Sequence, residues 1–77
     1  MGINYYEAKY QDRIKDLLKQ NGYPELKNIP IGAFKQAMMI ILGMGEKGAD
    51  KWLGNFEMAG LIACRHLDEC NWVVDYV

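Results

Sequence analysis

The side chains best suited to catalysis lie close together near the carboxyl end of the sequence. Cys64 and His66 are two residues apart, and Cys70 follows shortly afterwards. A thiol nucleophile needs an adjacent base, and that base needs a partner that fixes its orientation. The sequence shows no such partner for His66, and the chain contains no serine or threonine that could replace the cysteine. We therefore do not expect an enzyme.

The same residues are poor candidates for a metal site or a disulfide. A structural zinc site needs four ligands, and Cys64, His66 and Cys70 provide at most three in an unusual spacing. If they belong to one hairpin that turns around residues 69–70, Cys64 faces Asp75, and the two sulfur atoms are too far apart to bond. We predict free thiols, a cytoplasmic location, and no bound metal or cofactor.

Residues that could bind nucleic acid recur along a predicted helix at about residues 46–59. Lys47, Lys51 and Asn55 follow one another at intervals of four, which places them on one strip of the helix. Lysine can contact phosphates or guanine, and asparagine can read adenine in the major groove of DNA. Gly48 and Gly54 would let a partner's backbone approach closely. This strip is the candidate DNA-binding surface, and its alternative is a solvated face of mixed charge.

Two further cations are candidates for contacts with phosphates. Lys35 lies near the start of the preceding predicted helix, and Arg65 lies on the first strand of a predicted hairpin. The overall charge opposes this role, because the formal net charge is −1 and the helix at 46–59 carries three acids and two lysines. Since affinity for DNA depends largely on neutralising phosphates, we expect weak or strongly salt-dependent binding.

A third group of residues could bind another protein. Met58, Trp72 and Tyr76 belong to types that are enriched at the centres of protein interfaces. The alternative for Trp72 and Tyr76 is that they pack onto the first and third helices as part of the core. The last predicted strand could also pair through an open edge with a second copy of the chain and form a homodimer.

These candidates would be positioned by a bend between two helices. Apolar residues recur at helical spacing on both sides of residues 42–45, and we expect them to form the core, with Trp52 at its centre. Gly43 suits a left-handed residue that ends the first of these helices. Gly45 suits the N-cap of the second helix, and the carboxylate of Glu46 interacts favourably with the positive end of the helix dipole there. The sequence thus predicts two helices that pack against each other across a tight turn.

The other elements are predicted from their periodicity. An apolar stripe indicates a helix at about residues 4–20, and alternation over 26–31 indicates a short strand. Residues 61–67 and 72–77 indicate two strands joined by a polar turn, as in a β-hairpin. The predicted order is helix, strand, helix, helix, strand, strand in one α+β domain. No apolar run reaches the roughly 18 residues that would span a membrane.

This order resembles the winged helix-turn-helix family over most of the chain. The stretch Glu57-Met58-Ala59-Gly60-Leu61-Ile62 is similar to the passage from recognition helix to wing in that family. The resemblance implies a single winged helix-turn-helix domain over residues 1–77, with the helix at about 46–59 as recognition helix. It also implies a DNA-binding protein, either a transcription regulator or a replication accessory.

Winged helices also serve as protein-binding modules, which gives an alternative function. In that case the chain would be an accessory subunit or an inhibitor of a larger complex, of the kind encoded by phages or plasmids. Two features depart from the family's pattern. Gly48 and Gly54 interrupt the recognition helix, and the wing tip carries the acids Asp68 and Glu69 where members that hold DNA with the wing usually have lysine or arginine.

Overall fold

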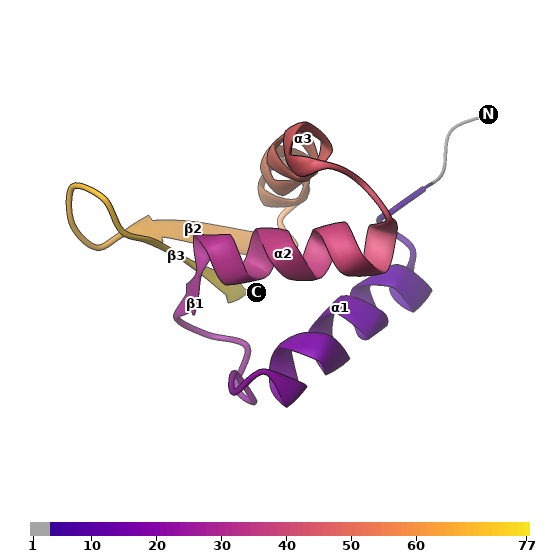
Figure 1. The fold of residues 1–77 in the computed structure, drawn as a ribbon, viewed down its shortest axis with the longest axis horizontal. Helices are drawn as coiled ribbons and strands as arrows, with labels where there is room; N and C mark the ends of the chain where they lie inside the picture. The colour runs from indigo at the N-terminus through magenta and orange to yellow at the C-terminus, as the bar shows by residue number, and fades with distance from the viewer. Residues whose placement is uncertain (1–3) are drawn as a thin grey trace.

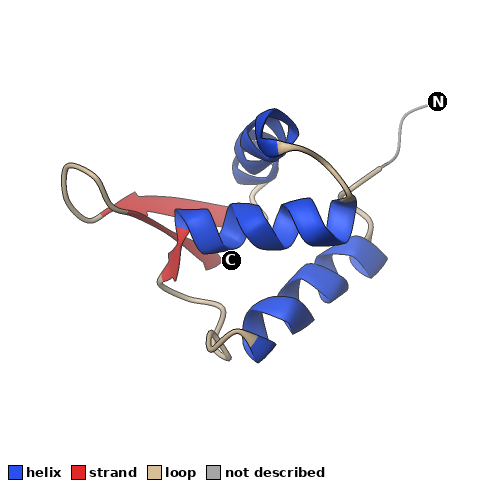
Figure 2. Ribbon diagram, viewed as in Figure 1, coloured by secondary structure: helices blue, strands red, loops and turns tan. Residues whose placement is uncertain are grey.

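Residues 4–77 are described in a computed structural model of the chain. In chain order they form α1 (Ala8–Gln20), β1 (Ile29–Pro30), α2 (Ile31–Leu42), α3 (Glu46–Met58), β2 (Ile62–His66) and β3 (Trp72–Tyr76). The predicted α+β class and order of elements are confirmed. Figures 1 and 2 show α2 in the middle of the molecule, between α1 and α3, and the β2–β3 hairpin projecting away from the helices.

The bend between α2 and α3 has the predicted geometry. Gly43 has a φ of 67°, in the left-handed region where glycine carries no steric penalty, and its N–H donates to the carbonyl of Met39. Gly45 is extended, with a φ of −82°, and caps α3. Since α3 begins directly at Glu46, the chain reverses within three residues and α2 contacts α3.

Two elements are shorter than the sequence predicted. The first helix begins at Ala8 instead of near residue 4. The strand predicted over 26–31 is reduced to Ile29–Pro30, because Leu26 and Asn28 have φ values of 58° and 56°. Positive φ lies outside the β region, so the alternation of apolar and polar residues there does not correspond to extended backbone.

The three strands form an antiparallel sheet in the order β1-β3-β2. Val74 of β3 lies opposite Ile29 on one side and opposite Cys64 on the other. The predicted pairing of Cys64 with Asp75 is therefore wrong by one residue. The prediction that the last strand has an open edge for pairing with a second copy of the chain is also wrong. β3 is the central strand, and both of its edges are occupied by β1 and β2.

The core lies between the helices and the face of the sheet that they cover. Its largest fully buried side chains are Phe34, Phe56, Ile14, Leu18, Ile29, Met38, Ile62 and Val74. Trp52, which was predicted at the centre, is only partly buried, and its ring centroid lies 4.9 Å from that of Tyr5. The reason is its position on α3, where it occupies a flank of the helix beside the buried residues Ala49, Leu53 and Phe56.

A buried polar contact joins the last strand to the first helix. The hydroxyl of Tyr76 donates to Oε1 of Gln11 at 3.1 Å, and Nε2 of Gln11 donates to the carbonyl of Tyr5 at 2.8 Å. Gln11 is 5% exposed and Tyr76 is 7% exposed. Tyr76 is thus a core residue, and its assignment to a partner surface is wrong. The ammonium of Lys15 covers its ring at 5.0 Å from the centroid.

Candidate nucleic-acid interface

The solvent side of α3 carries Lys47, Lys51, Gly54 and Met58, which we call the outward face. Their spacing of four, three and four residues places them along one line of the helix, and all four are exposed. Met58 retains 88% of its accessible surface. The predicted positions of the two lysines on an exposed strip are confirmed. Met58, assigned from sequence to a separate partner surface, lies on the same line.

Asn55 and Gly48 lie on a flank of α3 that faces away from the sheet, on the same side as Trp52. Asn55 is partly exposed, at the border of the outward face. A side chain at Gly48 would meet Cβ of Met44 at 3.1 Å, so this glycine makes room for the turn before α3. A Cβ at Gly54 would meet nothing within 4 Å. Of the two glycines for which close approach by a partner was predicted, Gly54 has the open space that this role needs and Gly48 does not.

The acids of α3 lie on the opposite flank, and two of them hold Lys35. Nζ of Lys35 lies 2.5 Å from Oδ1 of Asp50 and 4.0 Å from Oε1 of Glu46. The hydrogen bond to Asp50 raises the pKa of Lys35 above its ordinary value, so the ammonium keeps its charge. The side chain of Lys35 is only 22% exposed. Lys35 is therefore not the free phosphate-binding cation predicted from sequence, since it joins α2 to α3.

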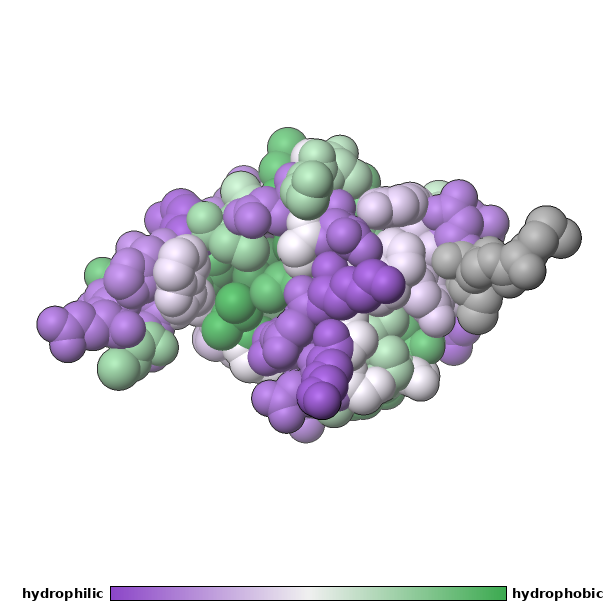
Figure 3. All heavy atoms as spheres, turned by 90° about the horizontal axis from the view of Figure 1, so that it is seen from above, coloured by the Kyte–Doolittle hydropathy of each residue, from purple (hydrophilic) through white to green (hydrophobic). Residues whose placement is uncertain are grey.

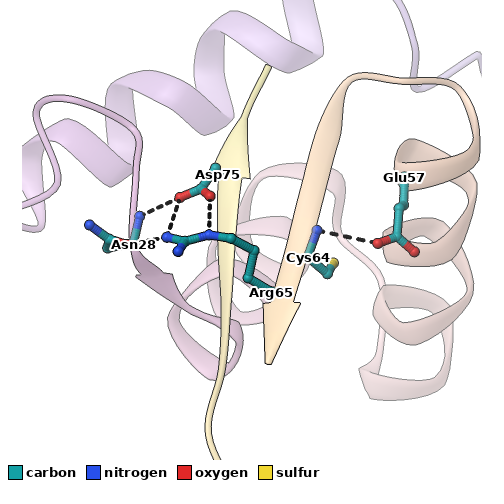
Figure 4. A network of polar contacts seen from close by, with 5 residues as sticks. All are labelled: Asn28, Glu57, Cys64, Arg65 and Asp75. Carbon is teal, nitrogen blue, oxygen red and sulfur yellow. Dashed lines mark hydrogen bonds and ion pairs between the residues drawn. The ribbon is translucent and has the colours of Figure 1, made fainter. Parts of the chain in front are cut away.

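The third acid of α3 binds the sheet. The backbone N–H of Cys64 donates to Oε2 of Glu57 at 3.2 Å, which occupies a donor on the free edge of β2 (Figure 4). Partial burial raises the pKa of the Cys64 thiol to about 11, and the carboxylate of Glu57 adds to this effect. A thiol with this pKa stays protonated at neutral pH, which is the unreactive form of cysteine.

Arg65 belongs to a polar network on the other face of the sheet. Its Nε donates to Oδ2 of Asp75 at 2.6 Å, and the guanidinium also donates to the side-chain oxygen of Asn28 (Figure 4). The N–H of Asn28 donates to Oδ1 of Asp75 at 2.7 Å. The network links β2 and β3 to the residue that precedes β1. Arg65 is thus committed to a structural contact and lies away from α3, contrary to the prediction that it binds DNA.

The sequence carries a signal for this network in the opposite charges of Arg65 and Asp75. Two opposite charges on one face of a hairpin attract each other when their positions are directly opposite or diagonal. In the observed register Arg65 lies opposite Val73, so Asp75 is its diagonal neighbour. The expected register was shifted by one residue and would have placed Arg65 and Asp75 on opposite faces of the sheet.

The remaining predicted partner residue lies at the far end of the hairpin. Trp72 is 44% exposed and does not pack onto the helices as the alternative interpretation proposed. Its ring stacks on that of His66, with 4.5 Å between centroids and 24° between planes. Cys64 and Cys70 are free thiols. Within residues 4–77, no three His, Cys, Asp or Glu side chains are grouped closely enough to hold a metal ion.

In the described part of the chain, none of the helices has the length and apolar character needed to cross a membrane. Comparison with protein-family models, with curated proteins and with solved structures found no match for this chain.

Proposed function

We propose that this chain is a winged helix-turn-helix protein that binds DNA through the outward face of α3, as a small regulator or a replication accessory. The order of elements supports the name. The helices α2 and α3 pack across a tight turn, and a hairpin that would be the wing follows α3 directly. The proposal includes a cytoplasmic location, with which the free thiols of Cys64 and Cys70 are compatible.

The observation that carries the proposal is the separation of charge around α3. The acids Glu46 and Asp50 face Lys35, and Glu57 faces the edge of β2. Within residues 4–77 no ion pair involves Lys47 or Lys51. Each acid of α3 therefore contacts another group of the protein, although the side chains of Glu46 and Asp50 remain 78% and 57% exposed. The two lysines are exposed and make no such contact among the described residues.

The outward face offers few cations, which limits the expected affinity. Figure 3 looks onto the side of the molecule that bears α3 and shows hydrophilic and hydrophobic residues intermixed there. Each phosphate neutralised contributes about 0.9 to the slope of log affinity against log salt. With Lys47 and Lys51 as the contacts, we expect a slope of about −2. Binding should be measurable at low salt and should weaken as salt is raised.

The test is fluorescence anisotropy of a labelled DNA duplex over a range of salt concentrations. Replacing both Lys47 and Lys51 by alanine should lower the affinity at least about tenfold at low salt and bring the slope close to zero. The matched control replaces Lys9 and Lys19 of α1 by alanine, which makes the same change in net charge at exposed positions. If the control and the α3 variant lose affinity equally, or if the unaltered chain does not bind duplex at low salt, the proposal is wrong.

The exposure of Met58 favours a second candidate function. A methionine that keeps 88% of its surface at the C-terminal end of the outward face is of the type used by protein-binding surfaces. In this reading the same face binds a protein, and the chain is an accessory subunit or an inhibitor of a larger complex. Met58→Lys separates the two candidates. It should strengthen binding to duplex and steepen the salt slope by about 1 if the face binds DNA, and it should leave duplex binding absent if the face binds protein.

A further inference from the structure

The hairpin end, residues 66–72, forms a surface that is separate from α3. Figure 1 shows it projecting beyond the helices, and each of its seven residues is exposed. His66 and Trp72 lie opposite each other across the two strands, and their rings stack. Because residue direction alternates along a strand, this ring pair is on the same face as Cys64 and Val74, which is the face that the helices cover nearer the body.

Two large apolar side chains of this segment are exposed. Trp72 retains 44% of its surface on the aromatic face, and Leu67, which directly follows His66 and so does not belong to that face, retains 59%. Single exposed apolar residues are ordinary in proteins, but tryptophan is enriched among the residues that contribute most to binding energy, and Trp72 is also stacked on a neighbouring ring. The hairpin end therefore presents a pre-oriented aromatic face to solvent.

The turn next to this aromatic face in the chain carries two acids. Asp68 and Glu69 form the turn, and hydrogen bonds from the side chain of Asn71 and the backbone of Cys70 hold the pKa of Asp68 below its ordinary value, so it stays ionised. The nearest arginine or lysine along the chain, Arg65, is bound to Asp75 on the opposite face of the sheet. Among the described residues of the hairpin, no ion pair neutralises Asp68 or Glu69.

We infer that the hairpin end docks a basic segment of a partner protein, with a lysine or arginine placed over the face of the Trp72 ring that His66 does not cover, and with Asp68 and Glu69 of the adjacent turn attracting the segment. An indole face attracts cations more strongly than any other side-chain ring, and a nearby carboxylate adds to the attraction. The same charges repel phosphate, which argues against a nucleic acid as the occupant. This surface is independent of the outward face of α3, so a chain that binds DNA could use the hairpin to recruit a second protein.

The test uses hexa-arginine amide as the probe and the fluorescence of Trp72 as the signal. The chain has two tryptophans, so Trp52→Phe leaves Trp72 as the only one. We expect a saturable change in Trp72 emission with hexa-arginine and none with hexa-glutamate or with a single-stranded oligothymidine. Calorimetric titration of the unaltered chain with hexa-arginine gives the same information if Trp52→Phe does not fold.

Two variants with the same change in charge decide whether the site is local. Glu69→Gln should weaken hexa-arginine binding about two- to fivefold, whereas Asp12→Asn on the exposed side of α1 should leave it unchanged. Lys47→Ala with Lys51→Ala should also leave it unchanged, which separates this surface from the DNA-binding proposal. The inference is overturned if hexa-arginine gives no saturable signal, if Asp12→Asn weakens binding as much as Glu69→Gln does, or if oligothymidine binds in place of hexa-arginine.

Discussion

The assignment of Tyr76 to the core can be tested by removing one oxygen atom. In Tyr76→Phe the ring still fills its place, but Oε1 of Gln11 loses the donor that lies 3.1 Å away. Gln11 is 5% exposed, so water cannot readily replace the lost hydroxyl. Leaving a buried acceptor without a partner costs about 1–3 kcal/mol. We expect Tyr76→Phe to lower the free energy of unfolding by about 1–2 kcal/mol, which corresponds to a melting point lower by roughly 4–16 °C in a domain of this size.

The assay is urea unfolding followed by circular dichroism, for the unaltered chain, Tyr76→Phe, Gln11→Met and the double variant. Once Tyr76 lacks its hydroxyl, Gln11→Met removes an acceptor that is already unpaired, so the two costs should not add. The double variant should be more stable than the sum of the single changes predicts by about 1 kcal/mol. If Tyr76→Phe unfolds at the same urea concentration as the unaltered chain, or if the two costs add, the reasoning about this contact is refuted.

The same residue makes stability depend on high pH. Burial raises the pKa of Tyr76 above its ordinary value of 10.0. The folded state therefore keeps a proton that the unfolded state releases, so the contribution of Tyr76 to stability is complete below pH 10.0 and falls as the pH rises above it. Tyr76→Phe should lose less stability than the unaltered chain between neutral pH and pH values above 10.0. An equal loss in both proteins would place the hydroxyl in contact with water.

Three other predictions follow from the contacts of the sheet and of α3. The hydrogen bond from Arg65 lowers the pKa of Asp75 below 3.8. The contribution of Asp75 to the free energy of unfolding is therefore complete above pH 3.8 and is lost as the pH falls further. Asp75→Asn should remove part of the acid sensitivity seen in pH-dependent unfolding. Gly54→Ala should stabilise the chain by about 0.5–1 kcal/mol in thermal melts, while Gly48→Ala should gain less or destabilise, because its new Cβ would lie 3.1 Å from Met44. Lys35→Gln should weaken duplex binding about two- to fivefold by freeing Asp50, and Asp50→Asn should strengthen it; equal affinities would show that these charges do not reach the bound DNA.

Much of the fold could be predicted because it depends on local rules. The left-handed Gly43, the extended Gly45 and the start of α3 at Glu46 each follow from the backbone preferences of a few adjacent residues. The exposure of Lys47 and Lys51 follows from helical periodicity, which also places Ala49, Leu53 and Phe56 inside. The first strand was predicted too long because Leu26 has a left-handed backbone that its residue type does not indicate, and because Asn28, a type that tolerates this conformation, was assigned to the strand.

The sequence by itself determined the order of the elements, the turn between α2 and α3 and the lysine strip on α3, because these depend on contacts between near neighbours in the chain. Only the tertiary structure decided which strand is central, which residue faces Cys64, and which cations remain free. Lys35 and Asp50 are fifteen positions apart in sequence, and Gln11 and Tyr76 are sixty-five apart. Pairs at such separations are selected by how the helices and the sheet pack, since many side chains of the right type compete for each partner until packing brings one of them within reach.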